Sequence, residues 1–256
     1  MEFLYYFLGK NLKKINISII FPFYNEEKRL KNLFSSIKKF QKNLFINCEF
    51  IFVNDGSTDH SYNLIKFFLK REKIKSAQLL TYRNNKGKGY AIKKGVIKSK
   101  FEWILISDID LSVKLDFFLK WFKLYNLNKN YAYFGSRNLK SSKIKTIFIR
   151  KIIGKALQFL IYIFIDRNLT DTQCGYKLYS NLYAKKIFNK LSINRFSYDI
   201  EVIELLKRDK IKIIELPVNW NHVSGGNVNL ITDSIKSLLD LIKIIFRYSI
   251  LNKFLK

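Results

Sequence analysis

The first half of the chain alternates between two patterns of apolar residues. Continuous runs of β-branched and aromatic residues predict buried strands, and apolar residues spaced three and four apart predict helices between those strands. The predicted strands are 15–23, 50–53, 79–82 and 103–106, and the predicted helices are 26–40, 61–69 and 90–98. Strands that alternate with helices favour an α/β fold with a mostly parallel central sheet. One such domain is the simplest organisation.

The C-terminal part of the chain, 229–256, follows a different pattern. Charged residues recur at helical spacing with large apolar residues between them, which predicts an amphipathic helix. The charged positions are Lys236, Asp240, Lys243 and Arg247, and the apolar positions are Ile235, Leu238, Leu239, Ile242, Ile245 and Phe246. Two interpretations fit: a helix that packs on the core, and a helix that lies on an anionic bilayer. No apolar stretch reaches the roughly 20 residues that a membrane-spanning helix needs.

Composition narrows the class of protein. The 256 residues include 47 Lys and Arg against 20 Asp and Glu, a net charge of +27, yet 48% of the chain is hydrophobic. That apolar content excludes a disordered basic tail. The charge fits an anionic partner, such as nucleic acid, a nucleotide or a membrane surface, and it also fits a background bias towards lysine. The basic residues are dispersed and zinc-finger spacing is absent, which argues against nucleic acid.

Carboxylates are scarce in this chain, so their positions are informative. Asp108 and Asp110 follow the strand 103–106, where an Asp-x-Asp pair offers hard oxygen ligands to Mg²⁺ or Mn²⁺ carrying a diphosphate. Asp55 follows the strand 50–53, and its position fits either a turn or a contact with a nucleobase edge. Near Gly87 and Lys88 neither the Walker spacing nor Gly-x-Gly-x-x-Gly occurs, but the glycines would let backbone amides approach a negative ligand.

Eight sequence blocks carry a family resemblance when they are read in order. They are 21–27, 53–59, 85–89, 108–110, 135–137, 171–177, 196–201 and 215–220. This series resembles the family 2 glycosyltransferases, within them the polyprenyl-phosphate group, and most closely the dolichyl-phosphate β-glucosyltransferases. The resemblance implies a Rossmann-like GT-A catalytic domain over 15–228, between a segment 1–14 and the helix 229–256. It also implies a nucleotide-sugar donor, a divalent metal, Mg²⁺ or Mn²⁺, and inversion at the sugar carbon.

The resemblance also implies roles for individual residues. Those expected to bind the nucleotide sugar are Pro22, Tyr24, Glu26, Asp55, Gly87, Lys88 and Asp108. The expected metal ligands are Asp108 and Asp110, and the expected acceptor-phosphate residues are Arg137, Arg150 and Lys151. The candidate catalytic residues are Asp110, Asp171 and Arg137. Cys174 is interpreted as a buried loop residue rather than a nucleophile.

The expected reaction moves a hexose, glucose from UDP-glucose, onto a polyprenyl or dolichyl phosphate. Transfer of mannose from GDP-mannose is the alternative within the same class. A lipid phosphate has its second pKa near 6 and is largely ionised at pH 7, so it needs no strong general base. Asp171 is therefore expected to orient the reactants, with proton abstraction as its other possible role. The expected location is peripheral, on the cytoplasmic face of the plasma membrane in a prokaryote or of the endoplasmic reticulum in a eukaryote.

Overall fold

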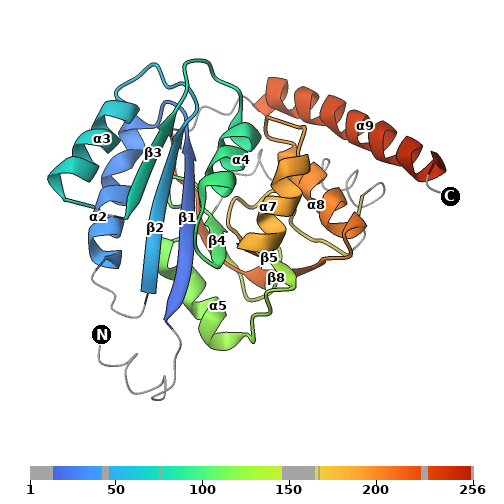
Figure 1. Cartoon of the computed structure of the whole chain (residues 1–256), viewed down its shortest axis with the longest axis horizontal. Helices are drawn as coiled ribbons and strands as arrows, with labels where there is room; N and C mark the ends of the chain where they lie inside the picture. Colours follow the sequence, from blue (N-terminus) through green and yellow to red (C-terminus); the bar gives the residue numbers. More distant parts are fainter. Residues whose placement is uncertain are drawn as a thin grey trace.

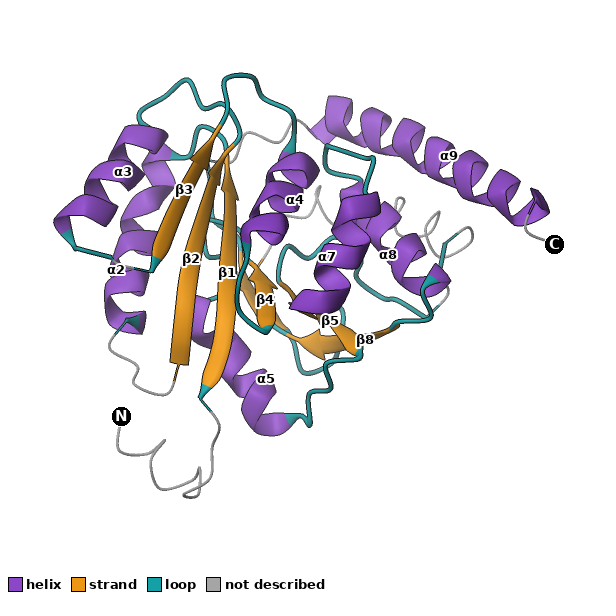
Figure 2. Cartoon of the chain, in the orientation of Figure 1, coloured by secondary structure: helices purple, strands orange, loops and turns teal. Residues whose placement is uncertain are grey.

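A seven-stranded sheet forms the centre of the computed structural model, which describes residues 14–41, 46–74, 76–145, 165–166, 168–225 and 230–254 (Figures 1 and 2). In spatial order its strands are β3 (Ala77–Thr81), β2 (Ile46–Asn54), β1 (Ile15–Phe23), β4 (Trp103–Ile106), β7 (Lys177–Ser180), β5 (Tyr131–Ser136) and β8 (Lys212–Pro217). Only β7 runs antiparallel to its neighbours. A second, two-stranded sheet joins β6 (Lys143–Lys145) to β9 (Asn219–Asn221). The predicted mostly parallel sheet is confirmed.

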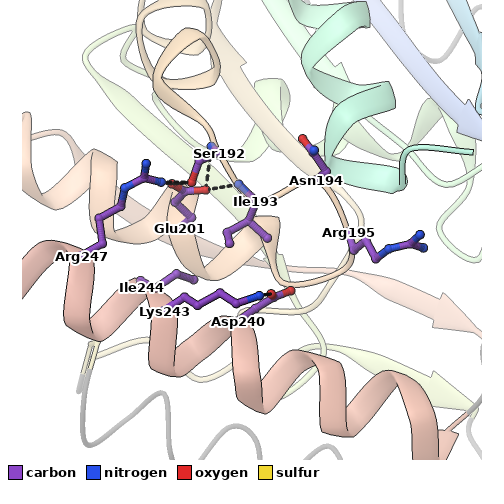
Figure 3. A pocket seen from close by; sticks show the side chains of 9 residues that line it. All are labelled: Ser192, Ile193, Asn194, Arg195, Glu201, Asp240, Lys243, Ile244 and Arg247. Atoms are coloured by element: carbon purple, nitrogen blue, oxygen red, sulfur yellow. Dashed lines mark hydrogen bonds and ion pairs between the residues drawn. The ribbon is translucent and has the colours of Figure 1, made fainter.

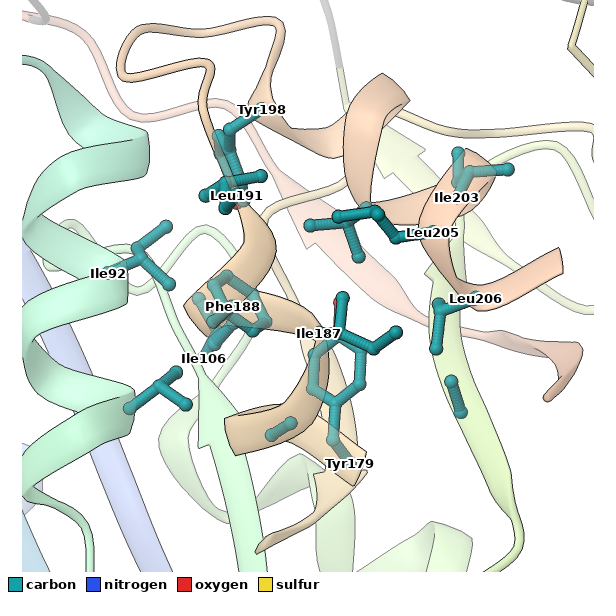
Figure 4. Close-up of a cluster of buried hydrophobic side chains, with 14 of the residues drawn as sticks. Ile92, Ile106, Tyr179, Ile187, Phe188, Leu191, Tyr198, Ile203, Leu205 and Leu206 are labelled. Atoms are coloured by element: carbon teal, nitrogen blue, oxygen red, sulfur yellow. The ribbon is translucent and has the colours of Figure 1, made fainter. Parts of the chain in front are cut away.

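Helices cover both faces of the large sheet because its strands are apolar on both sides. Alternate residues of β1 enter different cores: Ile20 belongs to one, and Ile19 and Phe21 belong to the other. The first core includes residues of α4 (Lys88–Lys98), α7 (Asn181–Lys190) and α8 (Tyr198–Arg208). The second includes residues of α2 (Leu30–Phe40), α3 (Ser61–Arg71) and α5 (Phe118–Leu124). Figure 4 shows the first core, where Phe188 of α7 lies between α4 and α8.

Several element boundaries differ from those that the sequence pattern predicts. The strand predicted at 103–106 has those bounds in the structure, whereas the second strand is longer at both ends. The helix predicted over 26–40 is divided into a 3-10 turn, Glu27–Arg29, and α2. The helix predicted from residue 90 begins at Lys88, because Gly87 has a φ of 105° and caps the helix in a conformation that L side chains rarely adopt.

The C-terminal helix α9 (Leu230–Phe254) runs along the outside of the molecule (Figure 1). Its inner side is a line of buried residues, Ser237, Leu241, Ile244 and Tyr248. Its outer side exposes a second apolar set, Leu238, Leu239, Ile242 and Phe246. The inner side agrees with the interpretation of a helix that packs on the core. The interpretation of a helix that lies on an anionic bilayer stays a prediction. Among the described helices, none combines the length and hydropathy that crossing a membrane requires.

Candidate active site

The polar residues singled out in the sequence meet where β1, β2 and β4 end. Hydrogen bonds join these three loops: Arg29, after β1, reaches Asp110, after β4, and the side chain of Ser57, after β2, accepts from the backbone of Asn25. Carboxyl ends of neighbouring parallel strands open towards the same edge of a sheet, which is where ligands bind in open α/β sheets. Pro22 is buried inside β1, and Tyr24 and Glu26 are half-buried in the loop that follows.

Asp55 holds the loop that contains Gly87. Its buried carboxylate accepts hydrogen bonds from the backbone nitrogens of Lys86 and Gly87, each at 2.8 Å, and from the Tyr82 hydroxyl at 2.8 Å. The Asn85 amide adds a fourth donor at 2.9 Å. These bonds fix the path of the loop just before α4. The predicted contact of Asp55 with a nucleobase stays a prediction.

The same loop, 85–89, which we call the donor loop, lies against the backbone that precedes α8. A Cβ atom at Gly87 would lie 2.5 Å from the carbonyl oxygen of Asn194, and one at Gly89 would lie 2.7 Å from that of Ile193. The backbone nitrogen of Tyr90 donates to the Asn194 carbonyl at 3.0 Å. Both glycines are therefore required by close contact between the two loops.

Asp108 lies between a lysine and a glycine. Its Oδ1 is 2.5 Å from the Nζ of Lys88, and a Cβ atom at Gly175 would lie only 2.1 Å from its Oδ2. Burial on its own would raise the pKa of Asp108, but the positive charges of Lys88, Lys177 and Arg29 together outweigh burial, and the pKa lies below its ordinary value. The carboxylate is therefore ionised at neutral pH, and Gly175 leaves room for it.

Asp110 is paired with Arg29, a residue that the sequence pattern did not single out. Its Oδ2 is 2.7 Å from Nη1 of Arg29, and its Oδ1 accepts from the backbone and the hydroxyl of Ser112, both at 2.9 Å. Arg29 also binds Glu26 through two nitrogens. Burial and the negative charge of Asp108 raise the pKa of Asp110. Arg29 lies one turn after Glu26, and this spacing is the only signal for it in the sequence.

Asp108 and Asp110 could bind a divalent metal, because carboxylate oxygens are the ligands that hard cations prefer. Among the described residues no group of three His, Cys, Asp or Glu side chains is arranged to hold a metal ion. Two carboxylates are nevertheless sufficient for a hard cation, because Mg²⁺ commonly takes one or two carboxylates and completes its shell with substrate phosphates and water. The two aspartates are thus suited to a metal that is bound together with a diphosphate.

Arg137 and Asp171 form a bidentate ion pair beside this site. Nε of Arg137 is 2.7 Å from Oδ2 of Asp171, and its Nη2 is 2.9 Å from Oδ1. The Arg137 backbone nitrogen adds a third bond, at 2.9 Å. Burial would raise the pKa of Asp171, but hydrogen bonding and charge from Arg137 lower it below its ordinary value. Asp171, which is 3% exposed, is therefore an ionised carboxylate whose lone pairs are largely occupied.

Two further residues hold this ion pair in place. Glu215 accepts hydrogen bonds from the backbone nitrogens of Thr170 at 2.9 Å and Asp171 at 2.7 Å. The guanidinium of Arg137 lies over the ring of Trp220, 5.5 Å from its centroid. Both belong to the block 215–220 that carried the resemblance, although the sequence assigned them no role. Arg150 and Lys151, expected at the acceptor phosphate, lie outside the described residues.

A buried ion pair lies under the site. Lys177 of β7 is fully buried, and its Nζ is 2.5 Å from Oδ1 of Asp199 at the start of α8. The nearby Cys174 is 1% exposed, which confirms the prediction that it is a buried loop residue. Burial raises the pKa of its thiol to about 12, so little thiolate exists at neutral pH.

Comparisons with known proteins identify the family of the chain. The model of the family described as glycosyl transferase family 2 matches residues 18–188. The chain is 31% identical to the dolichyl-phosphate beta-glucosyltransferase of Dictyostelium discoideum, over 93% of this chain and 76% of that protein. It is 33% identical to one from Trichomonas vaginalis (92% and 74%) and 30% identical to that of Homo sapiens (91% and 75%).

Solved structures show the same fold. Glucosyl-3-phosphoglycerate synthase from Mycobacterium tuberculosis, in complex with Mn²⁺, uridine diphosphate and glucosyl-3-phosphoglycerate, matches with a TM-score of 0.64 at 16% identity, over 90% of this chain and 80% of that chain. Mannosyl-3-phosphoglycerate synthase from Rubrobacter xylanophilus matches with a TM-score of 0.64 at 12% identity, over 92% and 75%. The predicted GT-A fold and the predicted enzyme class are confirmed. The chain belongs to glycosyltransferase family 2.

Proposed function

We propose that this enzyme transfers glucose from UDP-glucose to dolichyl phosphate and inverts the configuration at the sugar carbon. One observation carries the proposal: relatives that match more than nine-tenths of the chain at about 30% identity are dolichyl-phosphate beta-glucosyltransferases. The charges of the site support the proposal. Two carboxylates, Asp108 and Asp110, suit a metal that carries the donor diphosphate, and Arg137 beside them suits the acceptor phosphate.

The donor side of the reaction is assigned to the donor loop and the two aspartates. Lys88 would bind the diphosphate close to Asp108. The backbone amides in the first turn of α4, at the positive end of the helix dipole, would also attract the diphosphate. A divalent cation, Mn²⁺ or Mg²⁺, held by Asp108 and Asp110 would neutralise the negative charge that develops on the departing diphosphate. Tyr24 and Glu26 would lie beside the nucleotide.

The acceptor phosphate is assigned to Arg137. Two nitrogens of this guanidinium bind Asp171, and within the described part of the chain no hydrogen bond engages the third, Nη1. The side chain is 30% exposed, so Nη1 can reach a phosphate from the solvent side. An oxygen of the phosphate would attack the anomeric carbon of glucose, and the bond from that carbon to the diphosphate would break, with its electron pair leaving on UDP.

Asp171 orients Arg137 in this scheme and does not remove a proton. Its pKa lies below the ordinary value and its oxygens are occupied by Arg137, which makes it a weak proton acceptor. The attacking phosphate oxygen is already ionised near neutral pH, so the reaction releases no proton that would require a base.

The enzyme works at a membrane surface, because its donor is soluble in water and its acceptor is a lipid. The outer side of α9 exposes Leu239 and Phe246 beside the exposed Lys243 and Arg247, a composition suited to the interface of an anionic bilayer. We assign residues 15–228 to catalysis and 229–256 to this attachment, on the cytoplasmic face of the endoplasmic reticulum or of a plasma membrane.

A single assay tests the reaction. The purified chain is incubated with dolichyl phosphate and either UDP-glucose or GDP-mannose, with and without Mn²⁺ or Mg²⁺, and the lipid product is identified by mass spectrometry. We expect glucosyl phospholipid only, formed only with metal, and a loss of at least about 100-fold in Asp108→Asn. Asp116→Asn, an exposed acid near α5, is the matched control and should keep wild-type activity. A mannosylated product, or full activity in Asp108→Asn, would contradict the proposal.

A further inference from the structure

Glu201 is a buried carboxylate that the proposed reaction does not use. It lies in α8, is fully buried, and accepts hydrogen bonds from protein donors on two sides. On one side, its Oε2 accepts from the backbone nitrogens of Ser192 at 2.9 Å and Ile193 at 2.6 Å, and its Oε1 accepts from the Ser192 hydroxyl at 2.7 Å (Figure 3). A carboxylate that accepts hydrogen bonds in this way fixes the backbone that donates to it.

On its other side Glu201 is bound by α9. The Tyr248 hydroxyl donates to Oε1 at 2.9 Å, and Nη1 of Arg247 is 3.5 Å from the same oxygen. Arg247 also donates to the hydroxyl of Ser192. Because Arg247 is half exposed and Tyr248 is buried, the tyrosine hydroxyl is the contact that is better shielded from solvent.

The backbone that Glu201 holds is the one that supports the donor loop. The carbonyl of Asn194 accepts from the backbone nitrogen of Tyr90. The carbonyl oxygens of Asn194 and Ile193 lie only 2.5 and 2.7 Å from where Cβ atoms at Gly87 and Gly89 would be. A cavity of about 490 Å³ lies between 192–195 and the middle of α9 (Figure 3). Part of the interface between these segments is therefore not filled by side chains, and the bonds to Glu201 connect the two across it.

We propose that Glu201 is a positioning residue for the donor: it connects Tyr248 of α9 to the segment 192–194 and thereby fixes the donor loop in its binding conformation. The proposal rests on the function proposed above and extends the donor site to a helix that contributes no residue to it. Loss of the Tyr248 hydroxyl would loosen 192–194 and weaken binding of the nucleotide, whereas Arg137 and Asp171, on the acceptor side, would keep their ion pair.

Tyr248→Phe tests this connection, because it removes one oxygen and keeps the buried ring. The full chain is assayed with UDP-glucose and dolichyl phosphate, and UDP binding with Mn²⁺ is measured by calorimetry without acceptor. We expect the donor KM and the Kd for UDP to rise by about fivefold, with kcat and the acceptor KM within about twofold of wild type. Tyr125→Phe, at an exposed tyrosine after α5, is the matched control and should change neither.

Glu201→Gln is the second variant, because an amide nitrogen cannot accept the bonds that one oxygen now accepts. It should weaken UDP binding more than Tyr248→Phe does, and adding Tyr248→Phe to it should have little further effect. An unchanged Kd for UDP in Tyr248→Phe, equal losses for donor and acceptor, or additive effects in the double variant would overturn the inference. A wild-type chain that binds no UDP and transfers no glucose would instead overturn the proposed function on which the inference rests.

Discussion

A carboxylate can serve a transfer reaction without exchanging a proton, and the contacts of Asp171 suit the orienting role that we propose for it. Three bonds from Arg137 occupy it, and they lower its pKa although it is buried. The direction of the shift decides the protonation state. A carboxyl group with an ordinary pKa of about 4 is already ionised at pH 5, and a lowered pKa keeps it ionised at still lower pH, so Asp171 does not titrate between pH 5 and 8. The acceptor phosphate does titrate there.

The pH profile of the reaction should therefore follow the acceptor. We expect kcat/KM for dolichyl phosphate to rise with pH through about 6 and then to level off, as the phosphate loses its second proton. In Asp171→Asn the plateau should fall by at least about tenfold while the midpoint of the rise stays where it was, because Arg137 is misoriented and the phosphate is unchanged. A midpoint that moves or disappears in this variant would identify Asp171 as the base. The control is Asp116→Asn, which should reproduce the wild-type profile.

Among the elements, none of the strands after β4 was predicted from the sequence pattern, and β7 shows one reason. It has four residues, and one of them, Lys177, is fully buried in a position where a pattern predicts an apolar side chain. Its pairing with Asp199, from a distant part of the chain, and a hydrogen bond to the Thr172 carbonyl compensate for that burial. The strand predicted at 103–106 needed no such partner, because its burial follows from four consecutive apolar residues.

The same limit applies to the site. The blocks around Asp55, Asp108 and Asp171 could be located because polar residues follow predicted strands or match a family motif. Contacts between distant segments could not be predicted, because they depend on tertiary structure. Examples are the ion pair of Arg29 with Asp110 and the hydrogen bond between Glu201 and Tyr248 of α9. Glycines with a contact role were equally hidden, since the need for Gly175 appears only when Asp108 lies against it.

Breaking the Lys177–Asp199 pair should destabilise the junction of β7 and α8. We expect Lys177→Met to lower the free energy of unfolding by about 3–5 kcal/mol, because it leaves a buried carboxylate without its partner. The double variant Lys177→Met/Asp199→Leu should recover most of that loss, since both charges of the pair are then removed. Urea unfolding followed by circular dichroism measures both. A double variant no more stable than Lys177→Met would contradict this account of the pair.

At the scale of the whole molecule, the net charge of +27 and the exposed apolar side of α9 both suit the anionic lipid surface that we propose as the partner. A lipid surface with negative charge would attract the protein over a Debye length of about 10 Å, and apolar residues of α9 would then enter the interface. We expect the two contributions to act together, because salt screens the attraction between charges and leaves the apolar contribution in place.

Binding to vesicles should therefore depend on both. We expect wild-type protein to float with phosphatidylserine vesicles, less so as salt rises, and Leu239→Glu/Phe246→Glu to float at least about tenfold less. Leu124→Glu changes an equally exposed leucine at the end of α5 and is the matched control. Flotation that is unchanged by the α9 substitutions, or that is lost equally in the control, would remove α9 as the attachment.

The position of β7 in the sheet has a consequence for synthesis of the chain. β1, β2, β3 and β4 come from one continuous stretch and can pair soon after they leave the ribosome, but β4 then presents an unpaired apolar edge. Its partner on that edge, β7, is translated only after β5, and β8 closes the far side of the sheet later still. The nascent protein thus carries an open strand edge through the translation of its middle third, and during that period the edge can pair with other chains.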